Sequence, residues 1–105
     1  MKVVDRKTFL SMPENTVFAR YKFERLMELG IKCETRGEDF LYQDLGFSID
    51  CDFAEDIENA LNTDKIFRYD FSTVDRDGRF ELDAIFVVWD KEDVQSLINR
   101  LQECI

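Results

Sequence analysis

The chain has 105 residues, of which 45% are hydrophobic and 35% are charged, and its formal net charge at pH 7 is -9. A chain of this length and composition can bury a core of its own and is not a disordered tail, so we expect residues 1–105 to form a single globular domain. The sequence contains no histidine, which excludes the commonest general base and the commonest transition-metal ligand, and its negative charge argues against direct binding of nucleic acid.

The chain opens with the pattern of a short helix followed by a strand. Asp5 can act as an N-cap and Pro13 can end the segment, which predicts a helix over about residues 6–11. Residues 16–22 then alternate between two sets of side chains, as a partly buried strand does. We therefore expect the first strand of a sheet in this region.

A hairpin is predicted next along the chain. Residues 23–29 favour a helix by intrinsic propensity and predict a short helical turn, for which Gly30 is either the C-cap or a turn residue. Residues 31–35 and 40–45 flank a turn that includes Gly37, whose lack of a side chain suits a tight reversal. They predict two further strands.

An acidic helix is predicted after this hairpin. Asp52 followed by Glu55 has the form of a helix start, and apolar residues recur at helical spacing up to about Asn62. The carboxylates near this start, which include Asp50 and Asp56, could also gather around Mg²⁺, a cation that takes oxygen ligands. Helix capping explains them more simply, so we predict no metal site and no cofactor.

The clearest structural signal lies in the second half of the chain. An Asp-Gly dipeptide at residues 77–78 separates two long alternating runs, residues 66–74 and 80–89, and predicts a β-hairpin. A two-residue turn there would place Phe67 opposite Val88. Aromatic residues at alternating positions are expected in the core, namely Phe40, Tyr42, Phe47, Phe67, Tyr69, Phe71, Phe80 and Phe86.

A last helix is predicted after Asp90, which has the spacing of a capping box with Asp93. Its buried stripe is expected to consist of Val94, Leu97, Ile98, Leu101 and Ile105. We expect this helix to pack on the apolar face of the C-terminal hairpin. The order of elements predicts an α+β fold, a mainly antiparallel sheet of about five strands that includes the C-terminal β-hairpin and packs against two or three helices.

The cellular location can also be predicted. No apolar run approaches the roughly 18 residues of a membrane span, and the first residues lack the apolar core of a signal peptide. Cys33, Cys51 and Cys104 are widely spaced and odd in number, which fits reduced thiols. We expect a cytoplasmic protein that does not bind membranes.

Charge is distributed unevenly along the chain. Between Gly37 and Asp64 there are nine Asp or Glu residues and no Lys or Arg, whereas the other 77 residues contain 14 acids and 14 bases. Such a segment either keeps a protein soluble or forms a surface for a cationic partner. The candidate partner-binding residues are Glu38, Asp39, Asp50, Asp52, Glu55, Asp56 and Glu58.

This asymmetry leads to the principal functional hypothesis. Carboxylates spaced along a helix and a loop can imitate the phosphates of a duplex and occupy a basic groove. We therefore expect a non-enzymatic acidic protein that inhibits a basic, nucleic-acid-handling partner, such as a nuclease or a nucleic-acid-guided effector. A small carboxylate-dependent enzyme is a weaker alternative, because histidine and a Gly-rich phosphate loop are both missing.

A second hypothesis comes from the end of the last predicted strand. Ile85, Val87 and Trp89 lie on the face opposite Phe86 and Val88. They form either a second layer of core under the N-terminal segment or an exposed apolar interface. In the latter case the chain is a structural or assembly protein that self-associates, for example as a homodimer, through this face or through a free strand edge.

The first fifth of the chain also carries a resemblance. Residues 4–10, Pro13, residues 16–19 and Tyr21 resemble the starts of small uncharacterised proteins encoded by bacteriophages and prophages. The resemblance implies a context, because phage accessory proteins of this size are often inhibitors of host defence, including anti-CRISPR and DNA-mimic proteins. Acidic immunity proteins of similar size neutralise nuclease toxins. No catalytic or binding role follows for any single residue.

Overall fold

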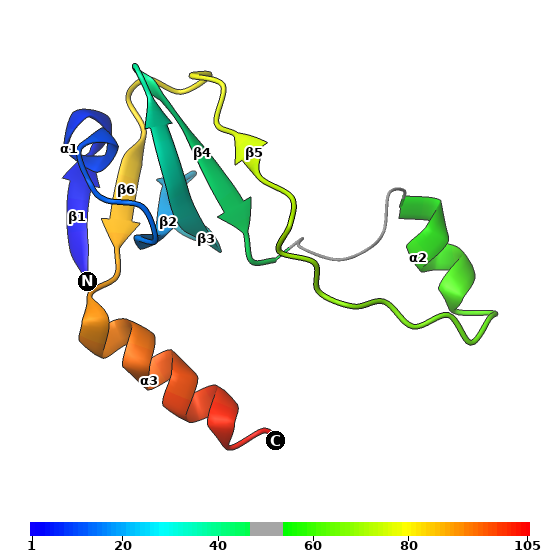
Figure 1. Ribbon diagram of the computed structural model, residues 1–105. Helices are drawn as coiled ribbons and strands as arrows, with labels where there is room; N and C mark the ends of the chain where they lie inside the picture. Colours follow the sequence, from blue (N-terminus) through cyan, green and yellow to red (C-terminus); the bar gives the residue numbers. More distant parts are fainter. Residues whose placement is uncertain (47–53) are drawn as a thin grey trace.

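The computed structural model describes residues 1–46 and 54–105 (Figure 1). Within these residues it contains a six-stranded antiparallel sheet and three helices, which confirms the predicted α+β fold. The strand order is β1-β6-β2-β3-β4-β5. The elements are β1 (Lys2–Asp5), α1 (Arg6–Leu10), β2 (Val17–Lys22), β3 (Arg25–Arg36), β4 (Asp39–Asp44), α2 (Ala54–Ala60), β5 (Asp75–Arg76), β6 (Ile85–Val88) and α3 (Lys91–Gln102).

The local predictions of the first half are largely confirmed. Asp5 caps α1, because its Oδ1 accepts a hydrogen bond from the Thr8 amide at 2.8 Å. Gly37 has φ of +61° in the turn between β3 and β4. The predicted acidic helix is α2, although its expected start at Asp52 lies outside the described residues. Strand β1 was missed, since four residues before a helix contain too little alternation to identify a strand.

The helical turn predicted over residues 23–29 is wrong. Phe23 and Glu24 have φ of 51° and 61° and form a tight turn between β2 and β3. Strand β3 begins at Arg25 and continues through Gly30, which is neither a cap nor a turn residue. Pairing of Arg25, Leu26 and Leu29 with β2 therefore overrides the weak helix propensity of these residues, and β4 pairs with β3 from Gly30 onward.

Gly30 instead makes room for a core side chain. A Cβ at this position would lie 3.1 Å from two ring atoms of Phe18 and 3.2 Å from the carbonyl oxygen of Gln43. We expect Gly30→Ala to lower the free energy of unfolding by roughly 2 kcal/mol in urea denaturation, because a packed ring and a backbone group must both move. Gly46→Ala is the control, since its new Cβ would meet only the flexible side chains of Asp44 and Glu28. Equal effects would contradict this explanation.

The prediction of a C-terminal hairpin is also wrong. Strand β6 pairs with β1 and β2, so that Val88 lies opposite Lys2 and Phe18 and not opposite Phe67. The short β5 pairs with β4 at the other edge of the sheet. In the sheet, β5 and β6 are therefore separated by β2, β3 and β4, and the predicted run of residues 66–74 contains none of the six strands. Strand β6 has bonded neighbours on both sides in this position, whereas a hairpin strand at an edge would have one.

The core is a small aromatic cluster on one face of the sheet, beneath α1. It consists of Val4, Phe9, Phe18, Phe40 and Phe86. The ring of Phe9 stacks on Phe86 with centroids 4.1 Å apart and lies 4.7 Å from Phe18. Phe40 and Phe86 confirm the core prediction, whereas Tyr69, Phe71 and Phe80 are exposed and Phe47 lies outside the described residues.

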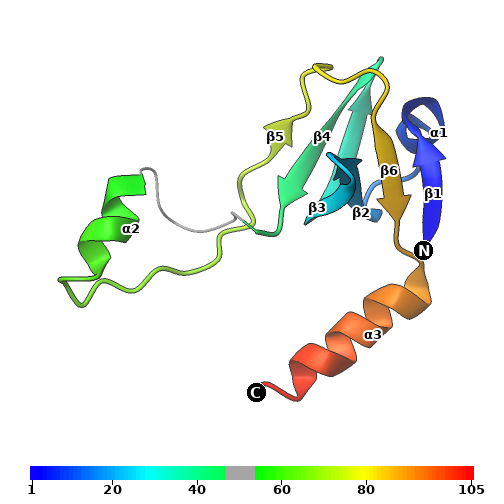
Figure 2. The ribbon, with the colours of Figure 1, turned by 180° about the vertical axis from the view of Figure 1, so that it is seen from behind.

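Helix α3 has the predicted start but not the predicted packing. The Asp93 amide donates to Asp90 Oδ1 at 3.0 Å, and the Asp90 amide donates to Asp93 Oδ2 at 3.1 Å, which completes the capping box. None of the α3 residues, all of which are described, is buried. The reason is visible in Figures 1 and 2: α3 leaves the end of β6 and lies beyond the ends of the strands, so it does not pack on the sheet.

Candidate interaction surfaces

The structure separates the candidate carboxylates into two groups. Glu38 and Asp39 lie where β3 turns into β4, and Asp56 and Glu58 lie on α2. Figures 1 and 2 show α2 far from the β3–β4 turn, beyond the β5 edge of the sheet. Glu55 belongs to the first turn of α2, whereas Asp50 and Asp52 lie outside the described residues. The described carboxylates therefore do not form one continuous surface.

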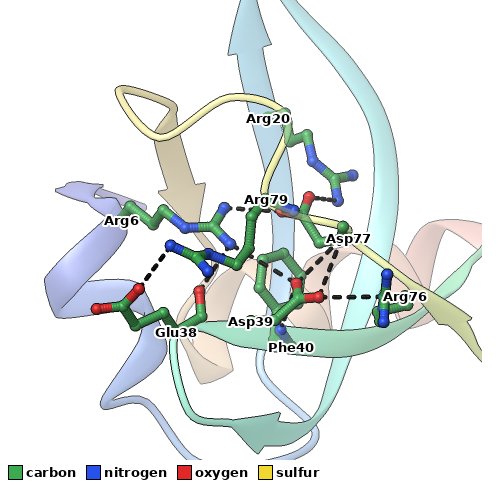
Figure 3. Close-up of polar contacts among 9 residues, drawn as sticks. Arg6, Arg20, Glu38, Asp39, Phe40, Arg76, Asp77 and Arg79 are labelled. Carbon is green, nitrogen blue, oxygen red and sulfur yellow. Dashed lines mark hydrogen bonds and ion pairs between the residues drawn. The ribbon is translucent and has the colours of Figure 1, made fainter.

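The Asp39 side chain is held in place by donors from its neighbour in sequence and from distant segments of the chain (Figure 3). Its side chain is only 13% exposed and accepts hydrogen bonds from the Phe40 amide at 2.9 Å and from the Gly78 amide at 3.1 Å. Arg76 Nε lies 3.3 Å from Asp39 Oδ2, and Arg6 Nη2 lies 3.7 Å from Oδ1. These contacts attach the loop after β5 to the start of β4, so Asp39 has a structural role.

Glu38 is also paired, although it is exposed. Its Oε2 lies 2.6 Å from Arg79 Nη2, and its carbonyl oxygen accepts a hydrogen bond from Arg6 Nη2 at 3.0 Å. The charge of Glu38 is thus partly compensated by a neighbouring cation. A cationic partner would have to compete with Arg79 for this carboxylate.

Asp77 is the centre of the network, and sequence reasoning missed it. Arg6 Nη1 donates to one carboxylate oxygen and Arg20 Nη2 to the other, each at 2.7 Å (Figure 3). Burial alone would raise the pKa of Asp77, but the hydrogen bonds and charges of Arg20 and Arg6 outweigh it and lower the pKa below its ordinary value. The partners are 57 and 71 residues away in sequence, so only the fold reveals the pairing.

The α2 helix is the exposed part of the acidic segment. From Ala54 to Asp64 the sequence has four carboxylates and no Lys or Arg. Glu58 is exposed and Asp56 is half-buried, and the apolar side chains of Ile57 and Leu61 are also exposed, Leu61 by 88%. The helix therefore presents both negative charge and apolar surface to solvent.

The apolar face predicted from Ile85, Val87 and Trp89 is open. Ile85 is exposed, and Val87 and Trp89 are half-buried. Across the sheet, Val3 lies opposite Val87 and Tyr21 lies opposite Ile85, so exposed apolar side chains continue onto β1 and β2. None of the described helices covers this face, which leaves the expected second core layer unformed.

A groove of about 940 Å³ continues the apolar surface to the start of α3. Its apolar lining comes from the loop before β2, from the end of β6 and from the first turns of α3, through Met12, Val17, Val88, Trp89 and Val94. In the described part of the chain, no three Cys, Asp or Glu side chains are arranged to hold a metal ion. The groove therefore suits a contact with apolar side chains better than it suits cation chemistry.

Two further findings bear on function. Among the described residues, no helix is both long enough and apolar enough to cross a membrane. Comparisons of the chain with protein-family models, with curated proteins and with solved structures find no match. The arguments for function therefore rest on the surfaces of this molecule alone.

Proposed function

We propose that this protein is a non-enzymatic acidic binding protein that inhibits a basic, nucleic-acid-handling partner in the cytoplasm. One observation carries the proposal: α2 projects from the sheet, Glu58 on it is exposed, and the sequence has no Lys or Arg from Gly37 to Asp64. The partner class is a protein with a cationic groove, such as a nuclease or a nucleic-acid-guided effector.

The physical argument depends on where charge is left uncompensated. The negative charges of Glu38 and Asp39 are matched by Arg79, Arg76 and Arg6, so they add little to long-range attraction. The carboxylates of residues 54–64 have no cation within their own segment. At physiological salt, fields are screened within about 8 Å, so charges on a projecting helix act on a partner before those on the sheet do.

The apolar residues of α2 supply the second requirement of a binding site. Charge steers association and selects the sign of the partner, whereas buried apolar contacts slow dissociation. Ile57 is exposed on the same helix as Asp56 and Glu58, and the exposed Leu61 follows the end of that helix. Asp50, Asp52 and Glu55 belong to the same stretch of sequence, and the proposal includes their carboxylates.

Charge reversal on α2 tests the proposal. The purified protein is used as bait in a bacterial lysate at low and at moderate salt, and a retained protein is then purified for affinity measurements. Replacing Glu55, Asp56 and Glu58 with lysine is expected to weaken binding by at least about 100-fold, because attraction becomes repulsion. The same affinity for the reversed protein would contradict the proposal.

A matched control separates the position of the charge from its amount. Glu24, Glu28 and Glu34 are exposed on the β2–β3 turn and on β3, and lysine at all three positions changes the net charge by the same amount as the reversal on α2. This control should bind within about threefold of the unaltered protein. Duplex DNA should compete for the partner if the carboxylates occupy its nucleic-acid groove. Retention of nothing except the bait itself would also count against the proposal.

A further inference from the structure

Two apolar surfaces of this molecule lack a covering layer among the described residues. The first, which we term the open sheet face, shares one side of β1, β6, β2 and β3 by the pairing register and surrounds the small, buried Ala19. It consists of Val3, Val17, Tyr21, Ile31, Ile85 and Val87. The second, termed the α3 stripe, consists of Val94, Leu97, Ile98 and Leu101. A sheet face and a helix stripe are the two surfaces that pack together in α+β proteins.

The total exposed area is larger than that of a compact monomer. The accessible surface is 8023 Å². A compact monomer of this mass exposes about 6,200 Å², so the excess is about 1,800 Å². A stable interface buries about 800 Å² on each partner, which is less than this excess, and the projecting α2 accounts for part of the excess.

The dimensions of the two surfaces match. Helix α3 has 12 residues. At 1.5 Å per residue its length is about 18 Å. The strands β1, β6, β2 and β3 are adjacent in the sheet, and with a spacing of about 4.8 Å they span about 14 Å between their axes. One α3 helix can therefore cross the whole width of the open sheet face.

The α3 helix of the same chain does not occupy this position. It starts immediately after β6, where the capping box of Asp90 and Asp93 fixes its first turn. Figures 1 and 2 show it beyond the strand ends and beside neither face of the sheet. A second copy can supply the helix, since a two-fold axis places α3 of each copy on the sheet of the other.

Charge permits this contact. The nine carboxylates between Gly37 and Asp64 account for the whole net charge of -9, because the other 77 residues contain 14 acids and 14 bases. The four strands of the open sheet face and α3 all belong to this neutral remainder. Two copies can therefore meet there while their acidic α2 helices remain outside the interface.

We infer that the protein forms a two-fold homodimer in which the α3 stripe of each copy covers the open sheet face of the other. Each copy contributes its α3 stripe to one contact and its open sheet face to the other, so both surfaces are used within the dimer and no filament follows. The inference does not depend on the proposed partner of α2, and either can fail without the other.

Oligomeric state tests the inference directly. Ile98→Glu together with Leu101→Glu should convert a dimer into a monomer, raising the dissociation constant at least about 100-fold in sedimentation equilibrium, because carboxylates enter an apolar contact. Both side chains are exposed in the single copy, so its fold should persist by circular dichroism. The matched control is Ile57→Glu on α2 with Leu61→Glu just after it, which should remain dimeric. An unaltered protein that is monomeric at its highest soluble concentration would overturn the inference.

Cross-linking distinguishes this dimer from one in which two α3 helices pair. In a background with Cys33, Cys51 and Cys104 replaced by serine, one copy carries Ile98→Cys and a second copy of different mass carries Ile85→Cys. A short bis-maleimide is expected to join the two copies in high yield, and much less with Leu61→Cys in place of Ile98→Cys. Cross-links only between two Ile98→Cys copies would reject the arrangement.

Discussion

Replacing Phe9 with alanine is expected to lower the free energy of unfolding by about 4 kcal/mol, the largest effect of any single truncation considered. The Phe9 ring is completely buried and contacts Phe18, Phe40 and Phe86 at centroid distances of 4.7, 4.9 and 4.1 Å. Its removal leaves a cavity at the centre of a small core. Because domains of this size are stable by only about 5–15 kcal/mol, the variant should be partly unfolded under mild conditions.

The measurement is urea denaturation followed by circular dichroism and by the fluorescence of Trp89. Phe80→Ala is the matched control, since the same atoms are removed from a ring that is 91% exposed. The control should change stability by less than about 0.5 kcal/mol. If the two alanine variants lost equal stability, Phe9 would not be the centre of the core.

Asp77→Asn is expected to lower the free energy of unfolding by about 3 kcal/mol, because a nearly isosteric change removes the anion between two buried or half-buried arginines. Arg6 and Arg20 each donate to Asp77 at 2.7 Å, and the Asp77 side chain is only 11% exposed. Without its charge, the Arg6 guanidinium keeps its burial but loses its strongest partner. Glu81→Gln, in an exposed pair with Lys22, should cost less than about 1 kcal/mol in the same urea titration.

The free energy of unfolding of the unaltered protein, compared with that of Asp77→Asn, is expected to depend on pH. The folded-state pKa of Asp77 is lower than the ordinary value of about 3.9 that applies to the unfolded chain. Its stabilising contribution is therefore complete above about pH 4 and is lost as the pH falls through the folded-state pKa. As the pH is lowered from about 7 to about 3, the stability of the unaltered protein should approach that of Asp77→Asn. A constant difference between them over this range would show that the carboxylate charge of Asp77 does not stabilise the fold.

Features that depend on neighbouring residues were predictable. Asp5 and Asp90 cap α1 and α3 as expected, because a cap joins groups only three residues apart. The β3–β4 hairpin was also predictable, since Gly37 supplies a positive φ and the flanking segments have strand composition. Each of these features is decided by contacts within a few residues.

Strand pairing was harder to predict because strands compete for partners across the whole chain. The runs around the Asp-Gly dipeptide have the pattern of a hairpin, yet β6 pairs with β1 and β2 instead. The run of residues 66–74 contains none of the strands, and β6 covers only Ile85–Val88 of the second run. Alternation by itself therefore decides neither that a strand forms nor which strand it pairs with. The prediction of a helical turn over residues 23–29 was wrong for a related reason. Pairing of β3 with its partner strands outweighs the helix propensity of these residues.

The sequence by itself determined the composition of the acidic segment, the α+β class and the apolar alternation that includes Ile85, Val87 and Trp89. Only the tertiary structure decided which carboxylates have partners, because Asp39 and Asp77 meet arginines brought from distant strands and from α1. It also decided that the α3 stripe and the open sheet face both remain uncovered in one copy. Composition and period are properties of the chain, whereas ion pairing and coverage depend on which distant segments fold against one another.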